Sequence, residues 1–83
     1  MADTQARSGV VERVRQVVVR VGKLPGPAFA DDADLYRELG VESVAALDLL
    51  WSLEEEFSLA IPDAGFNDAR SVRALAALIE SLP

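Results

Sequence analysis

The sequence predicts an all-α fold, a small bundle of three amphipathic helices and a minor fourth, which forms one domain over residues 1–83. Three segments, 9–21, 43–57 and 72–82, repeat apolar residues at the spacing of one helical face. A short third helix is expected between the last two segments. The chain has no internal repeat, and its length suits a single core. We expect residues 1–7 to form a disordered N-terminal tail.

The first segment carries a valine-rich face. Residues 9–21 place valines at the i, i+1, i+4, i+7, i+8, i+11 spacing, with polar residues such as Arg15 on the other side. A strand over residues 17–21 is the alternative, because β-branched residues favour strands and valines alternate there. The longer pattern favours a helix, which Ser8 would cap and Gly22 would end.

A long loop follows, to about residue 41. Pro25 and Pro27 cannot continue the helix, because each proline lacks an amide donor and fixes its own backbone angle. Apolar side chains recur through the loop, and they would be costly to leave in water. These anchors are Leu24, Phe29, Leu35, Tyr36 and Leu39. We therefore expect a packed loop, with a helical turn over residues 35–39.

Residues 43–57 form the clearest predicted helix, with Ser43 at its start. The expected core positions are Ala46, Leu49, Leu50, Leu53 and Phe57. A second apolar stripe lies to one side and starts next to Ser43. It consists of Val44, Leu47 and Trp51, beside Asp48, Glu54 and Glu55. As alternatives, Trp51 belongs to the core and the acidic residues form an ordinary solvated side.

The last part of the chain turns and ends in a helix. Ile61-Pro62-Asp63 changes the chain direction, and residues 65–68 give at most a short, irregular helix. Ser71 is predicted to cap the last helix. Its apolar face comprises Val72, Leu75, Ala76, Leu78, Ile79 and Leu82.

Composition excludes several classes of function. The chain has no Cys and no His, so it has neither a thiolate nor an imidazole for unaided hydrolysis or for most zinc sites. We expect it not to be an enzyme. The sequence shows no charged segment followed by an apolar run and no membrane span, and it contains no cysteine, so a cytoplasmic protein is expected. A monomer is the default expectation.

Charge is divided unevenly along the chain. Net charge is −6, yet residues 1–23 carry +3 and residues 24–83 carry −9. An acidic surface repels nucleic acid and attracts basic patches on proteins. We therefore expect protein partners and no nucleic acid.

The hydroxyl of Ser43 is the candidate reactive group. At the start of a helix it would lie among backbone amides that have no partner within the helix, and these amides favour an anion such as a phosphate. A plain N-cap serine is the alternative on this feature alone.

A wider set of motifs occurs in order and without gaps over roughly residues 34–80. They are Asp34-Leu35, Leu39-Gly40-Val41-Glu42-Ser43-Val44, Leu47-Asp48-Leu49, Leu53-Glu54-Glu55-Glu56-Phe57, Ile61-Pro62-Asp63 and Ser71-Val72-Arg73-Ala74-Leu75. Together they closely resemble the acyl carrier protein family. The resemblance implies a four-helix bundle with a short third helix, in agreement with the helical pattern above.

The resemblance also implies a covalent cofactor. Ser43 corresponds to the serine that receives 4′-phosphopantetheine from coenzyme A through a separate, magnesium-dependent phosphopantetheinyl transferase. The thiol of the arm would then hold cargo as a thioester. Glu42 and Val44 replace the family's usual Asp and Leu around the serine. Both keep the chemical type, but the longer Glu42 leaves open which transferase accepts the chain.

Partner recognition is expected on the surface beside Ser43. By resemblance, its acidic residues fall where carriers meet basic grooves of transferases and synthases, and an exposed tryptophan offers an apolar anchor. The predicted partner-binding residues are Glu42, Val44, Leu47, Asp48, Trp51, Glu54 and Glu55.

The cargo is left open between fatty acyl, polyketide and aminoacyl groups. Gly22-Lys23-Leu24-Pro25 and Ala33-Asp34-Leu35-Tyr36 look like small aminoacyl carriers that adenylating ligases load. Phe66 and Ala69 would line any acyl pocket. The alternative function is a carrier-like module that binds proteins and is never modified.

Overall fold

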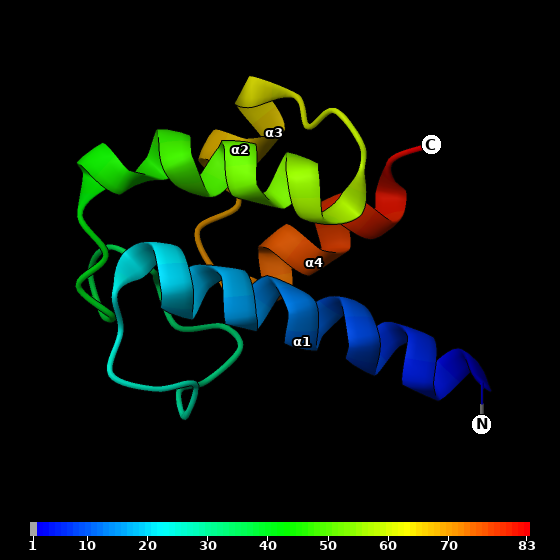
Figure 1. Cartoon of the computed structure of the whole chain (residues 1–83), viewed down its shortest axis with the longest axis horizontal. Helices are drawn as coiled ribbons and strands as arrows, with labels where there is room; N and C mark the ends of the chain where they lie inside the picture. The colour runs from blue at the N-terminus through cyan, green and yellow to red at the C-terminus, as the bar shows by residue number, and fades with distance from the viewer. Residues whose placement is uncertain (1) are drawn as a thin grey trace.

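The computed structural model describes the backbone of residues 2–83 and the side chains of residues 9–83. The helices are α1 (Ala2–Gly22), the 3₁₀ turn η1 (Ser43–Ala45), α2 (Ala46–Phe57), α3 (Asp63–Asp68) and α4 (Val72–Ser81). These described residues contain no strand, which confirms the all-α prediction with a short third helix. Figure 1 shows α2 running alongside α1, with α4 packed against α1 and α3 at the edge of the bundle.

The first helix starts earlier than predicted. It begins at Ala2, so Ser8 is not its cap. The good helix formers Gln5, Ala6 and Arg7 allow the helix to extend toward the terminus. The disordered tail over residues 1–7 stays a prediction, because Met1 and the side chains of residues 2–8 lie outside the described part.

The end of α1 is shaped to receive the segment that precedes Ser43. Lys23 takes the left-handed conformation with φ 55°, and the N–H of Leu24 donates to the Val19 carbonyl at 3.0 Å, which closes the helix. A Cβ on Gly22 would lie 2.9 Å from Cγ2 of Val41. Glycine at this position therefore lets Val41 pack directly against the helix end.

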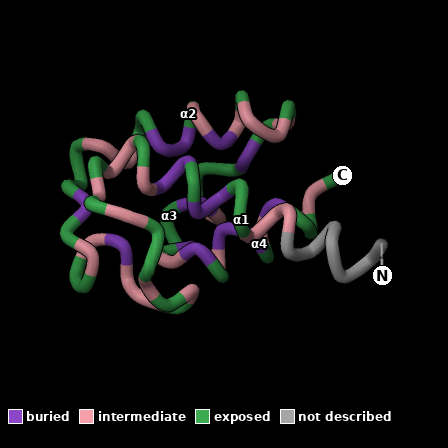
Figure 2. Tube along the Cα trace, turned by 60° about the horizontal axis from the view of Figure 1, so that its bottom comes forward, coloured by how far each residue is buried: buried purple, intermediate pink, exposed green. Residues whose placement is uncertain are grey.

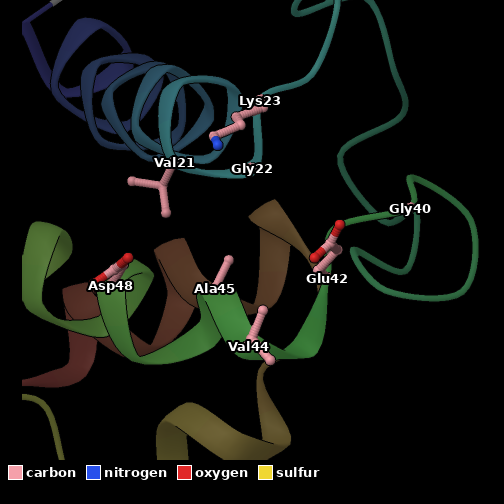
Figure 3. A pocket seen from close by; sticks show the side chains of 8 residues that line it. All are labelled: Val21, Gly22, Lys23, Gly40, Glu42, Val44, Ala45 and Asp48. Atoms are coloured by element: carbon pink, nitrogen blue, oxygen red, sulfur yellow. The ribbon is translucent and has the colours of Figure 1, made fainter.

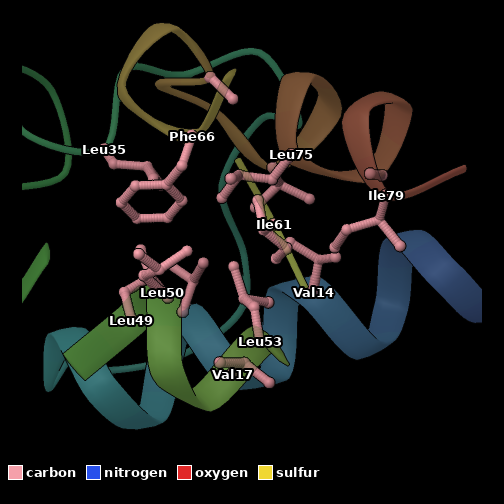
Figure 4. Packing of buried hydrophobic residues seen from close by; sticks show 14 of the residues in the cluster. Val14, Val17, Leu35, Leu49, Leu50, Leu53, Ile61, Phe66, Leu75 and Ile79 are labelled. Carbon is pink, nitrogen blue, oxygen red and sulfur yellow. The ribbon is translucent and has the colours of Figure 1, made fainter. Parts of the chain in front are cut away.

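The core lies between α1, α2 and α4 and is filled by aliphatic side chains. Leu49, Leu50 and Leu53 of α2 are buried as predicted, whereas Ala46 and Phe57 are only half-buried at the margin. Figure 2 shows buried positions recurring along α2 between exposed ones. In Figure 4 the α2 leucines meet Val14 and Val17 of α1, together with Phe66, Leu75 and Ile79.

The loop after α1 is held by a buried arginine. Arg15 is 9% exposed, donates to the carbonyls of Pro27 (3.0 Å) and Phe29 (2.7 Å), and pairs with Asp31. Its guanidinium also stacks over the Phe29 ring. The sequence pattern places Arg15 on the side of the helix away from the valine face, and the loop folds over this side chain and buries it.

The end of the loop is tied to the start of α4. The N–H of Leu35 donates to the Arg70 carbonyl and the N–H of Arg73 donates to the Asp31 carbonyl, each at 2.8 Å. Leu35 is fully buried, and the N–H of Val41 donates to its carbonyl at 2.9 Å. These contacts fix the path of the chain into Ser43.

Candidate functional site

Ser43 lies at the end of this fixed path and is exposed. Gly40 turns the chain with φ +76°, and Glu42 has an extended backbone. The Ala45 N–H then donates to the Glu42 carbonyl at 2.9 Å and closes the 3₁₀ turn. The continuous helix predicted from residue 43 is thus corrected, because a tighter turn precedes α2 and α2 itself begins at Ala46.

The hydroxyl of Ser43 has no capping role. The cap position of η1 is Glu42 and that of α2 is Ala45, and neither helix start has a side-chain cap bond. By contrast, Ser71 is the predicted cap of α4, and its Oγ accepts from the Ala74 N–H at 3.1 Å. The N-cap alternative for Ser43 is therefore wrong. Among the described residues, its hydroxyl has no hydrogen-bond partner.

Two hollows open beside Ser43, on the side of α3. The smaller, about 240 Å³, is lined by Tyr36, Ser43, Ala46, Asn67 and Arg70. The larger, about 330 Å³, is lined by Ser43, Val44, Ala46, Leu47, Leu50, Asp63 and Asn67. Phe66 and Ala69, which were expected to line an acyl pocket, are 4% and 7% exposed and line neither hollow. Phe66 instead fills the core (Figure 4).

A third hollow lies on the opposite side of η1, against the end of α1. It measures about 400 Å³ and is lined by Val21, Gly22, Lys23, Gly40, Glu42, Val44, Ala45 and Asp48. Figure 3 shows the carboxylates of Glu42 and Asp48 at its two sides and Lys23 at the end of the helix facing them. The residues that flank Ser43 in sequence, Glu42 and Val44, thus both line this hollow.

The apolar stripe beside Ser43 is on the surface. Val44 is 81%, Leu47 52% and Trp51 58% exposed, so Trp51 does not belong to the core. Asp48 and Glu55 are exposed on the same helix and lie two turns apart. The structure therefore brings together an apolar stripe with carboxylates at its margin.

Glu54 differs from the other predicted partner-binding residues. It is half-buried, and its Oε2 accepts from the Ile61 N–H at 2.9 Å. This bond holds the turn after α2, where Ser58 takes the left-handed conformation with φ 54°. One carboxylate oxygen of Glu54 is thus already occupied by a hydrogen bond within the fold.

Sequence reasoning did not identify Tyr36, Asn67 and Arg70 as site residues. Arg70 pairs with Asp34 through Nε–Oδ2 (3.0 Å) and Nη2–Oδ1 (3.4 Å), and its guanidinium lies 4.9 Å from the Tyr36 ring centre. The backbone N–H of Arg37, followed by the Arg70 side chain, lowers the pKa of Asp34 to about 2. Burial raises the pKa of Tyr36.

The described residues contain neither a metal-binding cluster nor a membrane-spanning helix. No group of three or more carboxylates there is arranged to hold a metal ion. No helix among residues 2–83 is both long enough and apolar enough to cross a membrane.

The chain is similar in sequence to one family model and to several known carrier proteins. Residues 12–79 match the family model described as "Phosphopantetheine attachment site". The acyl carrier protein of Campylobacter hominis is 33% identical over 73 residues, which cover 88% of this chain and 92% of the relative. The aminoacyl carrier protein of Agrobacterium fabrum is 38% identical over 56 residues, 65% of this chain and 66% of that protein. The chloroplastic acyl carrier protein 1 of Hordeum vulgare is 28% identical over 82 residues, 99% of this chain but 55% of that protein.

Proposed function

Since the chain belongs to the acyl carrier protein family, whose shared domain is the phosphopantetheine attachment site, we propose that Ser43 bears the 4′-phosphopantetheine arm and that the chain delivers thioester-bound cargo to partner enzymes. The observation that carries this proposal is the exposed Ser43 hydroxyl, which the fold leaves without a capping bond. Carriers of this family do not catalyse, and the chain supplies position and recognition.

The residues around Ser43 suit attachment of such an arm. The arm supplies a thiol, which a chain without cysteine lacks. Buried Val41 and Leu35 hold the chain on one side of the serine, and α2 holds it on the other. A modifying enzyme therefore meets an exposed hydroxyl on an anchored turn.

The surface beside Ser43 is the proposed docking site for a transferase and for loading and accepting enzymes. Val44, Leu47 and Trp51 offer an apolar contact, and Asp48 and Glu55 border it. An apolar centre with a charged margin suits a partner groove that is apolar inside and basic at its edge. Glu42 adds a carboxylate next to the serine, whereas Glu54 contributes only the oxygen that the Ile61 N–H leaves unused.

Small cargo fits the packing better than a long acyl chain. Phe66 and Leu50 are buried in the core, and the two hollows beside Ser43 measure about 240 and 330 Å³. A long chain would have to displace core side chains, whereas an aminoacyl group would not.

Intact-mass measurement tests the attachment. The unmodified protein is incubated with coenzyme A, Mg²⁺ and a broad-specificity phosphopantetheinyl transferase, and we expect the mass of one arm to be added. Ser43→Ala should add none, whereas Ser81→Ala should behave like the wild type, because Ser81 is also exposed but lies at the end of α4. No addition to the wild type would favour the unmodified protein-binding module instead.

A further inference from the structure

The hollow formed by Tyr36, Ser43, Ala46, Asn67 and Arg70 contains a positive charge next to the modification site. The larger hollow that Ser43 also lines contains an acidic residue, Asp63, and no basic one. Of the described residues that line either space with Ser43, Arg70 is thus the one cation. A phosphate esterified to Ser43 stays within one bond of Oγ and therefore lies close to both hollows.

Arg70 is held in place before any ligand arrives. Its Nε and Nη2 bind the Asp34 carboxylate, and its guanidinium stacks on the Tyr36 ring. A guanidinium has five N–H donors, and these two contacts leave the Nη1 donors without a bond to another described residue. Because Asp34 and Tyr36 have already fixed the side chain, a second anion would cost little further ordering entropy.

Most other charged side chains near Ser43 are acidic, and Lys23, in the hollow against the end of α1, is the exception. Glu42 precedes Ser43, Asp63 lines the larger hollow, and Asp48 lies in the first turn of α2. A phosphodiester added to Ser43 brings one more negative charge among these carboxylates. Among the described residues that line a hollow together with Ser43, Arg70 is the cation that can offset this repulsion at short range.

From this geometry we propose that Arg70 binds the phosphate of the arm on Ser43, and that the hollow between Tyr36 and Asn67 seats the first part of the arm. Arg70 is then a positioning residue that selects the side of η1 along which the arm leaves the protein. The inference rests on the proposed attachment to Ser43.

The test compares unmodified and modified protein for the wild type, Arg70→Gln and Arg73→Gln. Arg73 is the matched control, because it also pairs with a loop acid, Asp32, at 3.9 Å but lines neither hollow. Thermal unfolding is followed by circular dichroism, and the ³¹P NMR shift of each modified form is recorded. We expect modification to lower the Tm of Arg70→Gln by about 2 to 4 °C more than that of the wild type. In 1 M NaCl this difference should shrink.

A second variant separates the effect of losing the Arg70–Asp34 ion pair from the effect of losing phosphate binding by Arg70. Asp34→Asn weakens the same ion pair but keeps the Arg70 cation, so its ³¹P shift and its Tm change on modification should lie between those of the wild type and Arg70→Gln. Equal Tm changes and equal ³¹P shifts in the wild type and Arg70→Gln would overturn the role of Arg70. If intact mass shows no modification of the wild type, the attachment to Ser43 fails and this inference fails with it.

Discussion

The same substitution at two leucines of α2 should have very different effects. Leu53 is fully buried, whereas Leu47 is 52% exposed. Leu53→Ala removes three buried carbons, about 2.4 kcal/mol of transfer free energy, and the cavity left behind raises the loss to about 3 to 4 kcal/mol. Leu47→Ala loses roughly half of the transfer term and leaves no cavity, so we expect a loss of about 1 kcal/mol.

These losses are large relative to the stability of a domain this small. A chain of 83 residues is expected to have an unfolding free energy of about 4 to 12 kcal/mol. Urea unfolding followed by circular dichroism gives both free energies, and the Tm of Leu53→Ala should fall by about 12 °C or more. Equal losses for the two variants would refute the placement of Leu53 in the core and Leu47 on the surface.

Two further predictions concern a cap and a carboxylate. Ser71→Ala should lower the unfolding free energy by about 1 kcal/mol, because it removes the cap bond of α4. Ser43→Ala should change the unfolding free energy little, because Ser43 makes no cap bond. Urea titration measures both free energies, and equal losses would contradict the assignment of the cap. The pKa of Asp34 is lowered from 3.8 to about 2, so the folded state binds its proton less readily than the unfolded chain. Its stabilising effect is therefore complete above about pH 4 and is lost as the pH falls toward 2. Melting curves across this range should show a shallower decline for Asp34→Asn than for Asp32→Asn, and parallel curves would count against the pairing of Asp34.

Spacing in the sequence was enough to predict the interior helix faces. Leu49 and Leu53 are buried because a 3.6-residue period places them on one face, and Ser71 caps α4 because the serine immediately precedes an apolar period. The exposure of Trp51 was one of two alternatives. A helical wheel gives the angle of a side chain but does not show which neighbouring elements cover it.

The remaining features depend on contacts between distant segments. Arg15 is buried by carbonyls from a proline-containing loop, whose path follows no periodic pattern. Arg70 joins the site through Asp34, which lies 36 positions earlier in the chain. The 3₁₀ turn at Ser43 was also missed, because the apolar period of residues 43–57 continues smoothly across the change in hydrogen bonding.

The chain contains a single tryptophan, and that indole is largely in water. A partner that covers Trp51 would move it into an apolar environment and shift its emission to shorter wavelength. Fluorescence titration of the unlabelled protein could then measure docking before and after the serine is derivatised. Association and chemical loading become separable steps that one intrinsic signal can follow.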